Sequence, residues 1–407
     1  MPIFRKFALF GIFFIYLGIL IGVGIFFFQK ITNNKSTQSP FLQAVEFFES
    51  KSKIVEKTNT STKISYGFLP YWEDIDVNKS YEYLTHVSYF AIFLSEGGSI
   101  DRDYAGYKAL VKNDSRFVKI LESARTKKLK TNLTIAIHEV EKIDNFLECE
   151  KSCFEKSFIQ INEIVKKYSF QGLNFDFEYP TLLLNKNDII YANYVKQASD
   201  FFKKKYGENF EISVSVYGDS SIKSRITNLQ ELNSDKIDYL FVMSYDYVTR
   251  TSNIVGPSAP INGYPEYFEY DLTNTIISFL KIVPAEKLIL GIPLYGLNFI
   301  ADSELLYSNR IPGDEIRGFS MAQNLEQVYE VIERENITPQ YDENLGSYYF
   351  SYKEGVNTRV VFLEGEKSIS KKLEIIKNNN FLGVGFWALG YDSKFNYSKL
   401  KDFLNNK

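Results

Sequence analysis

Two carboxyl groups and an amide recur at every second position in the segment Gly172-Leu-Asn174-Phe-Asp176-Phe-Glu178. Because side chains on a β-strand alternate between its two faces, Asn174, Asp176 and Glu178 share one face and apolar residues share the other. Two carboxyl groups in one secluded site cannot both ionise easily, so one pKa rises and that group can act as a general acid. The spacing favours acid–base chemistry, with Glu178 as the acid and Asp176 as the neighbour that modulates it.

The polar face of this strand requires a special position in the fold. A parallel strand is normally apolar on both faces, and burying an amide with two carboxyl groups costs several kcal/mol unless they are paired. A buried hydrogen-bond network is the structural alternative to a catalytic role. Pro180 ends the strand, so Glu178 lies at its C-terminal end, where (β/α)8 barrels carry their chemistry.

Eight short runs rich in β-branched or aromatic residues alternate with helical stretches from residue 63 onward. This alternation indicates parallel strands with right-handed crossovers, and eight strands in about 340 residues predict an α/β fold of the (β/α)8 TIM barrel type. A doubly wound open sheet is the alternative, which the absence of a G-x-G-x-x-G or Walker loop disfavours. The expected strands are Ile64–Leu69, Thr85–Leu94, Lys130–Ile137, Gly172–Glu178, Glu211–Tyr217, Tyr239–Tyr245, Leu288–Leu294 and Gly383–Leu389. The expected helices include Tyr107–Lys127, Lys156–Tyr168, Ile189–Lys205, Thr273–Ile282 and Lys371–Asn378.

The extra length of the chain falls between the seventh and eighth strands, in residues 298–380. Within it, the segment that starts at Ser347, a turn near Glu354-Gly-Val-Asn and the run from Arg359 predict an antiparallel hairpin. We therefore expect a small α+β insertion on the barrel rim, which is either a stabilising cap or one wall of a substrate groove.

The N-terminal region contains a run of 22 residues without a charge, at residues 7–28. At about 1.5 Å per residue, a helix of that length crosses a bilayer core of roughly 30 Å. We predict one transmembrane anchor, preceded by a cytoplasmic tail (1–6) and followed by a linker (29–62) and an extracytoplasmic catalytic domain (63–405). A cleaved signal peptide is the alternative.

Composition excludes several classes of function. A net charge of −3, from 47 basic and 50 acidic residues, argues against a polybasic nucleic-acid binder. Two His and two Cys in the whole chain leave little material for a Cys/His zinc site, and no metal or cofactor is expected. Cys149 and Cys153, placed in the loop after the third strand, form either a disulfide or a reduced pair.

The segment Phe170-Gln-Gly-Leu-Asn-Phe-Asp-Phe-Glu178 resembles the D-G-x-D-x-D-x-E signature of glycoside hydrolase family 18, the chitinase-like barrels. The resemblance covers residues 63–405. Motifs at the other strands support it in the same order along the chain: Tyr66-Gly-Phe-Leu-Pro-Tyr-Trp72, Leu84-Thr-His-Val-Ser-Tyr-Phe-Ala91, Met243-Ser-Tyr-Asp246, Leu290-Gly-Ile-Pro-Leu-Tyr-Gly296 and Gly383-Val-Gly-Phe-Trp387.

The chain departs from the family pattern at three places. Gln171 and Asn174 replace two aspartates of the signature, and Asn174 resembles the bacterial spore-cortex and cell-wall branch of the family. Asn174 is expected to hold Asp176 by a hydrogen bond without accepting its proton, which would alter the pH dependence. The third strand lacks the family's S-x-G-G and ends at His138. That histidine either lies at the rim of the site or has no role.

The resemblance implies substrate-assisted catalysis, in which the substrate's own acetamido group is the nucleophile. Glu178 would protonate the glycosidic oxygen, Asp176 would orient the acetamido group, and Tyr245 would hydrogen-bond its oxygen. Asp246 would position the sugar, and Trp387 would form the floor under the ring. The other residues expected to bind substrate are Asn174, Met243, Tyr66, Trp72 and Tyr295.

Three functions from different classes follow from these features. The favoured one is a membrane-anchored, retaining glycosidase with a monomeric catalytic domain that cleaves β-linked N-acetylglucosamine polymers, peptidoglycan slightly ahead of chitin. The second is a non-catalytic sugar-binding protein, which the presence of Glu178, Asp176 and Tyr245 disfavours. The third is a structural protein whose barrel binds a partner, and no motif specifies that partner.

Overall fold

The computed structural model describes residues 63–73, 81–179, 186–391 and 398–405. The predicted tail, anchor and linker (1–62) lie outside these residues. Within the described ranges, no helix is both long enough and apolar enough to cross a membrane.

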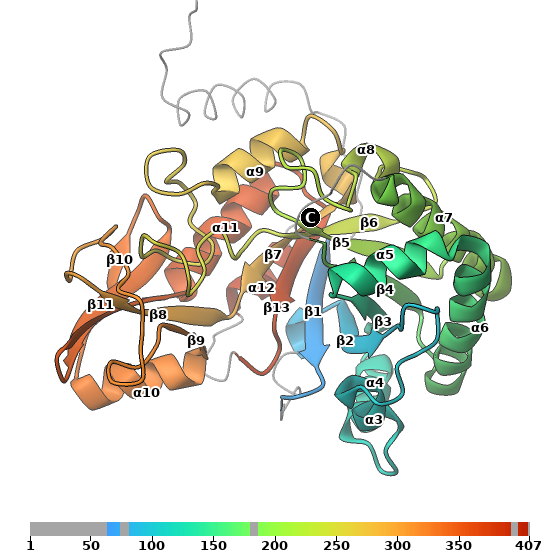
Figure 1. The fold of residues 1–407 in the computed structure, drawn as a ribbon, viewed down its shortest axis with the longest axis horizontal. Helices are drawn as coiled ribbons and strands as arrows, with labels where there is room; N and C mark the ends of the chain where they lie inside the picture. Colours follow the sequence, from blue (N-terminus) through green and yellow to red (C-terminus); the bar gives the residue numbers. More distant parts are fainter. Residues whose placement is uncertain (1–62, 74–80, 180–185, 392–397, 406–407) are drawn as a thin grey trace, which may run out of the picture. The chain divides into compact units, whose positions relative to one another are not determined.

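Eight parallel strands close into a barrel, in the order β1-β13-β7-β6-β5-β4-β3-β2 (Figure 1). Closure is complete because β1 pairs with β2 on one side and with β13 on the other. The (β/α)8 prediction is therefore confirmed, and the open sheet is excluded. The barrel strands are β1 (Ile64–Pro70), β2 (His86–Phe93), β3 (Lys130–Ile137), β4 (Gly172–Phe177), β5 (Glu211–Tyr217), β6 (Tyr239–Met243), β7 (Leu288–Pro293) and β13 (Gly383–Trp387).

Helices connect successive strands of the barrel (Figure 1). The single helix expected over Tyr107–Lys127 is wrong, because the chain breaks at Lys112–Ser115, where Asp114 adopts a positive φ of 54°. Asn, Asp and Ser in this stretch compete with helical hydrogen bonds. The helical segments are η1 (Tyr81–Tyr83), α3 (Ala105–Val111), α4 (Arg116–Thr126), α5 (Val140–Glu148), α6 (Glu150–Tyr168), α7 (Asn187–Tyr206), α8 (Leu229–Leu232), α9 (Leu272–Phe279), η2 (Ala285–Lys287), α11 (Glu366–Asn378) and α12 (Ser398–Asn405).

A disulfide joins Cys149 and Cys153, whose Cα atoms are 5.6 Å apart. The expected loop is wrong: Cys149 lies at the junction of α5 and α6, and Cys153 belongs to the first turns of α6. Glu150, with a positive φ of 41°, turns the chain between the two helices, and the disulfide spans this turn. The disulfide fixes the junction of α5 and α6, within the connection between β3 and β4.

The insertion between β7 and β13 forms a second, antiparallel sheet, in the order β10-β11-β12-β8-β9 (Figure 1). The predicted hairpin is confirmed, because Glu354 pairs with Asn357 across its turn. An apolar face of α10 (Leu325–Glu335) packs on this sheet through Val328 and Val331. The strands are β8 (Tyr295–Ala301), β9 (Met321–Asn324), β10 (Gln340–Asp342), β11 (Ser347–Glu354) and β12 (Asn357–Leu363).

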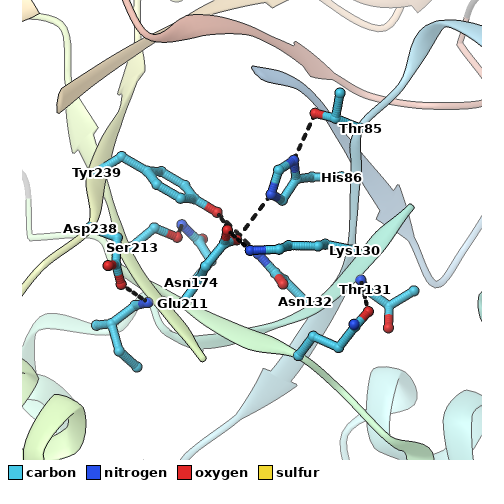
Figure 2. Close-up of polar contacts among 12 residues, drawn as sticks. Thr85, His86, Lys130, Thr131, Asn132, Asn174, Glu211, Ser213, Asp238 and Tyr239 are labelled. Carbon is cyan, nitrogen blue, oxygen red and sulfur yellow. Dashed lines mark hydrogen bonds and ion pairs between the residues drawn. The ribbon is translucent and has the colours of Figure 1, made fainter. Parts of the chain in front are cut away.

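A cluster of polar side chains fills the N-terminal end of the barrel (Figure 2). Glu211, the first residue of β5, forms ion pairs with Lys130 and with His86, whose Nε2 lies 3.0 Å from Glu211 Oε2. The Tyr239 hydroxyl donates to the same carboxylate at 3.0 Å and accepts from Asn132 Nδ2 at 3.1 Å. Four strands thus supply paired charges and hydrogen bonds at the end opposite Glu178.

Candidate active site

The polar face of β4 points into the barrel. Asn174 and Asp176 are buried, at 0% and 3% exposure, and Glu178 follows the strand at its C-terminal end, partly open to solvent. The face-sharing prediction is confirmed by the register with β3, which pairs Ala136 with Asp176 and Ile137 with Phe177. Both carboxyl groups therefore lie at the end of the barrel where loops meet.

A pocket of about 330 Å³ opens at this end of the barrel. Its walls combine aromatic rings with a few acidic groups, a lining suited to a ligand that has apolar faces and polar edges. Seven residues predicted from the sequence line this one pocket: Trp72, Asp176, Glu178, Met243, Tyr245, Asp246 and Trp387.

Glu178 is a carboxylic acid of this pocket whose pKa is shifted into the neutral range. Burial, together with the negative charge of Asp176, raises its pKa from 4.5 to about 7. His138 and a hydrogen bond of 3.1 Å from the Tyr217 hydroxyl to Glu178 Oε2 act in the opposite direction. A carboxyl group with this pKa is partly protonated at neutral pH and can donate a proton there.

Asn174 does not hold Asp176, which corrects the expected hydrogen bond. Its Nδ2 donates to Ser213 Oγ at 3.1 Å, and its Oδ1 accepts from Ser215 Oγ at 3.0 Å. The reason is the β4–β5 register, which places Asn174 directly beside Ser213. Both polar ends of the amide are occupied by β5, so Asp176 must find its partner elsewhere.

His138 supplies that partner and belongs to the pocket. Its Nε2 lies 3.2 Å from Asp176 Oδ2 and 3.5 Å from Glu178 Oε1. Sequence reasoning left its role open, because the signal lies in the strand register. Extending the β3–β4 pairing by one residue, as the bond from Glu178 N to Ile137 O does, brings His138 opposite Glu178.

The ligand atoms of His138, Asp176 and Glu178 all lie within 4.8 Å of one another, the one such grouping found in the described residues. That spacing could accommodate a divalent cation, but spacing alone does not identify a metal site. The imidazole nitrogen already contacts both carboxylates directly, so the groups satisfy one another as a charge-paired cluster.

Tyr245 and Asp246 follow the C-terminal end of β6 and line the pocket there. The Tyr245 hydroxyl has no hydrogen-bond partner among the described side chains, and the pKa of this phenol lies well above its usual value because of burial and the neighbouring carboxylates. It therefore remains a donor at neutral pH. Asp246 Oδ1 accepts from Ser258 Oγ at 3.2 Å and from the Tyr295 hydroxyl. Tyr295 thus positions Asp246 as well as lining the groove.

Trp387 lies between the pocket and a second hollow. The ring of Phe90 meets it edge-on at 4.6 Å, and Trp72, 43% exposed, lies 6.1 Å away. The second hollow, of about 470 Å³, shares Asp246 and Trp387 with the first and extends to residues of β8, β9 and α10. The insertion therefore lines a hollow that adjoins this pocket at Asp246 and Trp387.

Two residues predicted to bind substrate, Asn174 and Tyr66, do not line either hollow. Asn174 is completely buried and bound by two serines of β5, and Tyr66 lies deeper still. It is completely buried and packs against His86 and Tyr239, near the polar base of the barrel. As the third residue of β1, it points inward well below the strand's C-terminal end. The sequence motif predicts the strand on which Tyr66 lies, but it does not predict how deep in the barrel its side chain packs.

Comparison with known proteins identifies the family of this barrel. The model of the glycosyl hydrolases family 18 matches residues 29–392. The chain belongs to the glycosyl hydrolases family 18. Membership in this family of glycosidases agrees with the β4 carboxylates and with the barrel that positions them.

Two similar proteins, one bacterial and one from an insect, show how far the similarity extends along the chain. The cortical fragment-lytic enzyme of Bacillus subtilis is 28% identical over 255 residues, which are 60% of this chain and 53% of that protein. A probable chitinase 10 of Drosophila melanogaster is 27% identical over 338 residues, 78% of this chain and 14% of that protein. The chain thus spans about half the length of the first relative and a small part of the second.

Solved structures of family 18 show the same fold. The Bacillus megaterium spore cortex-lytic enzyme SleL superposes with a TM-score of 0.67 at 18% identity, over 86% of this chain and 76% of the other. A group IV chitinase of Ostrinia furnacalis in complex with allosamidin gives a TM-score of 0.71 at 19% identity, over 84% and 98%.

The two changes in the family 18 signature lie at different depths. Gln171 precedes β4, where its Oε1 accepts from the backbone of Thr131 at 3.2 Å. It therefore lies at the opposite end of the strand from Glu178. Asn174 lies between them, bound to β5 as described above.

Proposed function

We propose that this protein is a retaining glycosidase that cleaves β-linked N-acetylglucosamine polymers, with Glu178 as the general acid and base. The observation that carries the proposal is the pair of β4 carboxyl groups in an aromatic pocket, one of them with a pKa of about 7. An acid that is still partly protonated at neutral pH, beside a second carboxylate, matches the requirement of glycosidic bond cleavage.

The proposed reaction is assisted by the substrate. Glu178 donates its proton to the glycosidic oxygen as the bond from that oxygen to C1 breaks. The acetamido carbonyl oxygen of the sugar that carries this C1 forms a bond to C1 and gives an oxazolinium. Asp176 balances the positive charge on the oxazolinium nitrogen. Glu178, now ionised, removes a proton from water as the water oxygen attacks C1 and the oxazolinium C1–O bond breaks. The acetamido group is restored, and the two displacements together retain the configuration at C1.

Tyr245 and Trp387 supply the remaining contacts in this proposal. The free Tyr245 hydroxyl is a donor for the acetamido oxygen, and the Trp387 ring provides an apolar floor for the sugar. Aromatic faces pack well on the C–H surfaces of sugars, and the polar groups between them fix the orientation. Asp246, held by Tyr295 and Ser258, is placed to bind a sugar hydroxyl.

The relatives support the substrate class and leave its source open. One is named for cortical fragments and another for chitin, and the Cycas revoluta chitinase was solved in complex with (GlcNAc)3. We favour peptidoglycan over chitin because the asparagine of the signature resembles the spore-cortex and cell-wall branch. The binding of sugar without cleavage is the alternative function.

The deciding experiment compares the purified full chain with its Glu178→Gln variant. Both are incubated with N-acetylchitooligosaccharides and with purified peptidoglycan, and new reducing ends are followed by mass spectrometry. Cleavage by the unmodified protein alone supports the proposal, and the polymer that is cut identifies the substrate. NMR of the first product should show retained configuration. Binding of the oligomers by both proteins, with cleavage by neither, would establish the sugar-binding alternative.

We further propose that residues 7–28 anchor the protein in a membrane, with residues 63–405 on the extracytoplasmic side. The support is the uncharged stretch of 22 residues. Cells that produce the full chain should retain it in the membrane pellet after alkaline carbonate washing, and a variant without residues 7–28 should appear in the soluble fraction. A full chain released by the wash would contradict the anchor.

A further inference from the structure

His138 makes the contacts that the family pattern leads one to expect from residue 174. Asn174 is bound at both ends of its amide by Ser213 and Ser215. In the described part of the chain, His138 is the only side chain with a hydrogen bond to the Asp176 carboxylate. Asp176 Oδ1 is buried without any hydrogen-bond partner there. The orientation of Asp176 therefore depends on the imidazole.

The imidazole ring is itself held in place. Phe93 meets it edge-on, with ring centroids 4.9 Å apart, and Phe90 lies 6.2 Å away on the same wall. Phe93 in turn stacks on Tyr104 at 4.0 Å. Aromatic packing of this kind restricts the ring to one orientation, which is what a group that positions another requires.

The charges around His138 are almost all negative. Nε2 must carry a proton to donate to an ionised carboxylate, since a carboxylate only accepts. Lys and Arg are absent from the described lining of the pocket, so His138 is its one basic side chain. Besides Asp176 and Glu178, the titratable groups that line the pocket are Tyr104, Tyr217, Tyr245 and Asp246.

We propose that His138 is a positioning residue of the active site, whose Nε2–H holds the Asp176 carboxylate in its working orientation and places a positive charge between Asp176 and Glu178. This inference rests on the proposed function. His138 gives the Asp176 carboxylate a basic partner from the end of β3, whereas the family signature has an acidic residue at position 174 of β4.

Proton affinities of the cluster agree with this arrangement. Burial disfavours the charged imidazole, yet the hydrogen bond and charge of Asp176, with the charge of Glu178, raise the pKa of His138 above its usual value. In return, the charge of His138 lowers the pKa of Glu178, against burial and Asp176. Removing the imidazole should therefore leave Glu178 protonated to higher pH.

The kinetic test compares three proteins after dialysis against EDTA: the unmodified full chain, His138→Gln and His138→Ala. Glutamine keeps a donor without the charge, and alanine removes both. We expect kcat to fall on the order of 10- to 100-fold in His138→Gln and further in His138→Ala, as for other partners that orient a reacting group. KM should change less than kcat. The basic limb of the kcat/KM profile should move to higher pH in both variants.

A matched control is Lys142→Gln, which removes a positive charge from α5 close to the same rim. Lys142 pairs with Glu139 on the surface, so the pH profile of this variant should match that of the unmodified protein. An unmoved basic limb in the His138 variants, with lower activity and lower thermal stability, would show a merely structural role and overturn the proposal. Activity that requires added divalent cation after EDTA treatment would also overturn it.

A second measurement does not depend on activity. The chain has two histidines, His86 and His138, so ¹⁵N-histidine NMR resolves both in the full protein, and His138→Gln assigns them. We expect His138 to titrate above the usual range and to move down in Asp176→Asn, with His86 unchanged. No response to Asp176→Asn would refute the pairing. If the unmodified protein cleaves no substrate, the proposed function fails, and this titration still decides whether His138 is coupled to Asp176.

Discussion

At the scale of single residues, replacing Glu178 should change both turnover and the pH dependence of stability. Glu178→Gln should lower turnover by at least about 100-fold, the usual minimum effect of a lost general acid. Its effect on stability should depend on pH. Because burial and Asp176 raise the pKa of Glu178 from 4.5 to about 7, the folded state favours the protonated form. The stability that this group contributes is complete below about pH 4.5 and is lost as the pH rises through 7.

The glutamine variant cannot ionise and avoids that loss. Its melting temperature, relative to the unmodified protein, should therefore be higher at pH 8 than at pH 5. Calorimetry at both values measures the difference. The same offset at both pH values would mean that Glu178 titrates normally in the folded protein.

A second residue-scale prediction concerns the hydroxyl of Tyr295. It donates to Asp246 Oδ1 and also contacts Ser258 Oγ at 2.8 Å. Tyr295→Phe should destabilise the protein by about 1.5–3 kcal/mol, the usual range for a hydrogen bond to a charged group. A double-mutant cycle with Asp246→Asn, followed by urea unfolding, measures the coupling.

Tyr349→Phe is the matched control for this change, since its hydroxyl bonds to Gln340 at an exposed site. Its effect should stay within about 0.5 kcal/mol. Additive effects of Tyr295→Phe and Asp246→Asn would show that the two side chains do not depend on each other.

At the scale of elements, strand β7 packs directly against the ring of Tyr245, and Gly291 leaves room for that ring. A Cβ atom added at Gly291 would lie 2.7 Å from Cε1 of Tyr245 and 2.8 Å from the carbonyl oxygen of Val242. Gly291→Ala should therefore displace the Tyr245 ring and cost about 1–3 kcal/mol of stability, as overpacking usually does. We expect activity to fall with it, measured per folded molecule.

Gly97→Ala tests the same substitution without the clash, because the nearest atom to its added Cβ is Lys156 Nζ at 3.9 Å. This variant should keep both stability and activity. Full activity in Gly291→Ala would mean that the position of Tyr245 matters little for the reaction.

Elements were more predictable from the sequence than their contacts. The eight strands and the hairpin follow from local patterns of side chains, and these patterns survive in the fold. The partners of Asn174 and Asp176 do not, because they come from β5 and β3 through registers that no local pattern encodes. Tyr66 illustrates the same limit, since its motif gives the strand but not the depth at which its ring packs.

The same reasoning explains which residues of the site were found. Carboxylates on a strand are conspicuous because they are costly to bury, whereas Ser258 lies in a long connection after β6 and looks ordinary in the sequence. Its hydroxyl matters only because the fold brings Asp246 within 3.2 Å. A left-handed φ of 59° at Asp246 is likewise visible only in three dimensions.

At the scale of the whole molecule, the polar cluster around Glu211 closes the N-terminal end of the barrel. Burial opposes the charge of Glu211, but His86 and Lys130 outweigh it and lower the pKa of Glu211 to about 2. Glu211→Gln would remove the carboxylate shared by Lys130, His86 and Tyr239 in a partly buried cluster, and we expect a loss of about 1–3 kcal/mol. Urea unfolding at pH 7 measures it.

The pH dependence of this loss has a definite sign. Because the pKa of Glu211 is lowered in the folded state, its contribution is present above about 4.5 and is lost as the pH falls toward 2. The difference in unfolding free energy between the unmodified protein and Glu211→Gln should therefore stay constant from pH 7 to about pH 4.5 and narrow between about pH 4.5 and pH 2. Equal stability at pH 7 would contradict a structural role for the cluster.

The two ends of the barrel thus respond to acidity in opposite directions. The Glu211 cluster at the N-terminal end loses its ion pairs as Glu211 is protonated in acid. Glu178 at the C-terminal end loses its proton as the pH rises above about 7. Activity should therefore decline progressively as the pH rises above about 7 while the framework stays intact, and lowering the pH again should restore it. A cell could therefore pause this chemistry reversibly, with no need to make the molecule again.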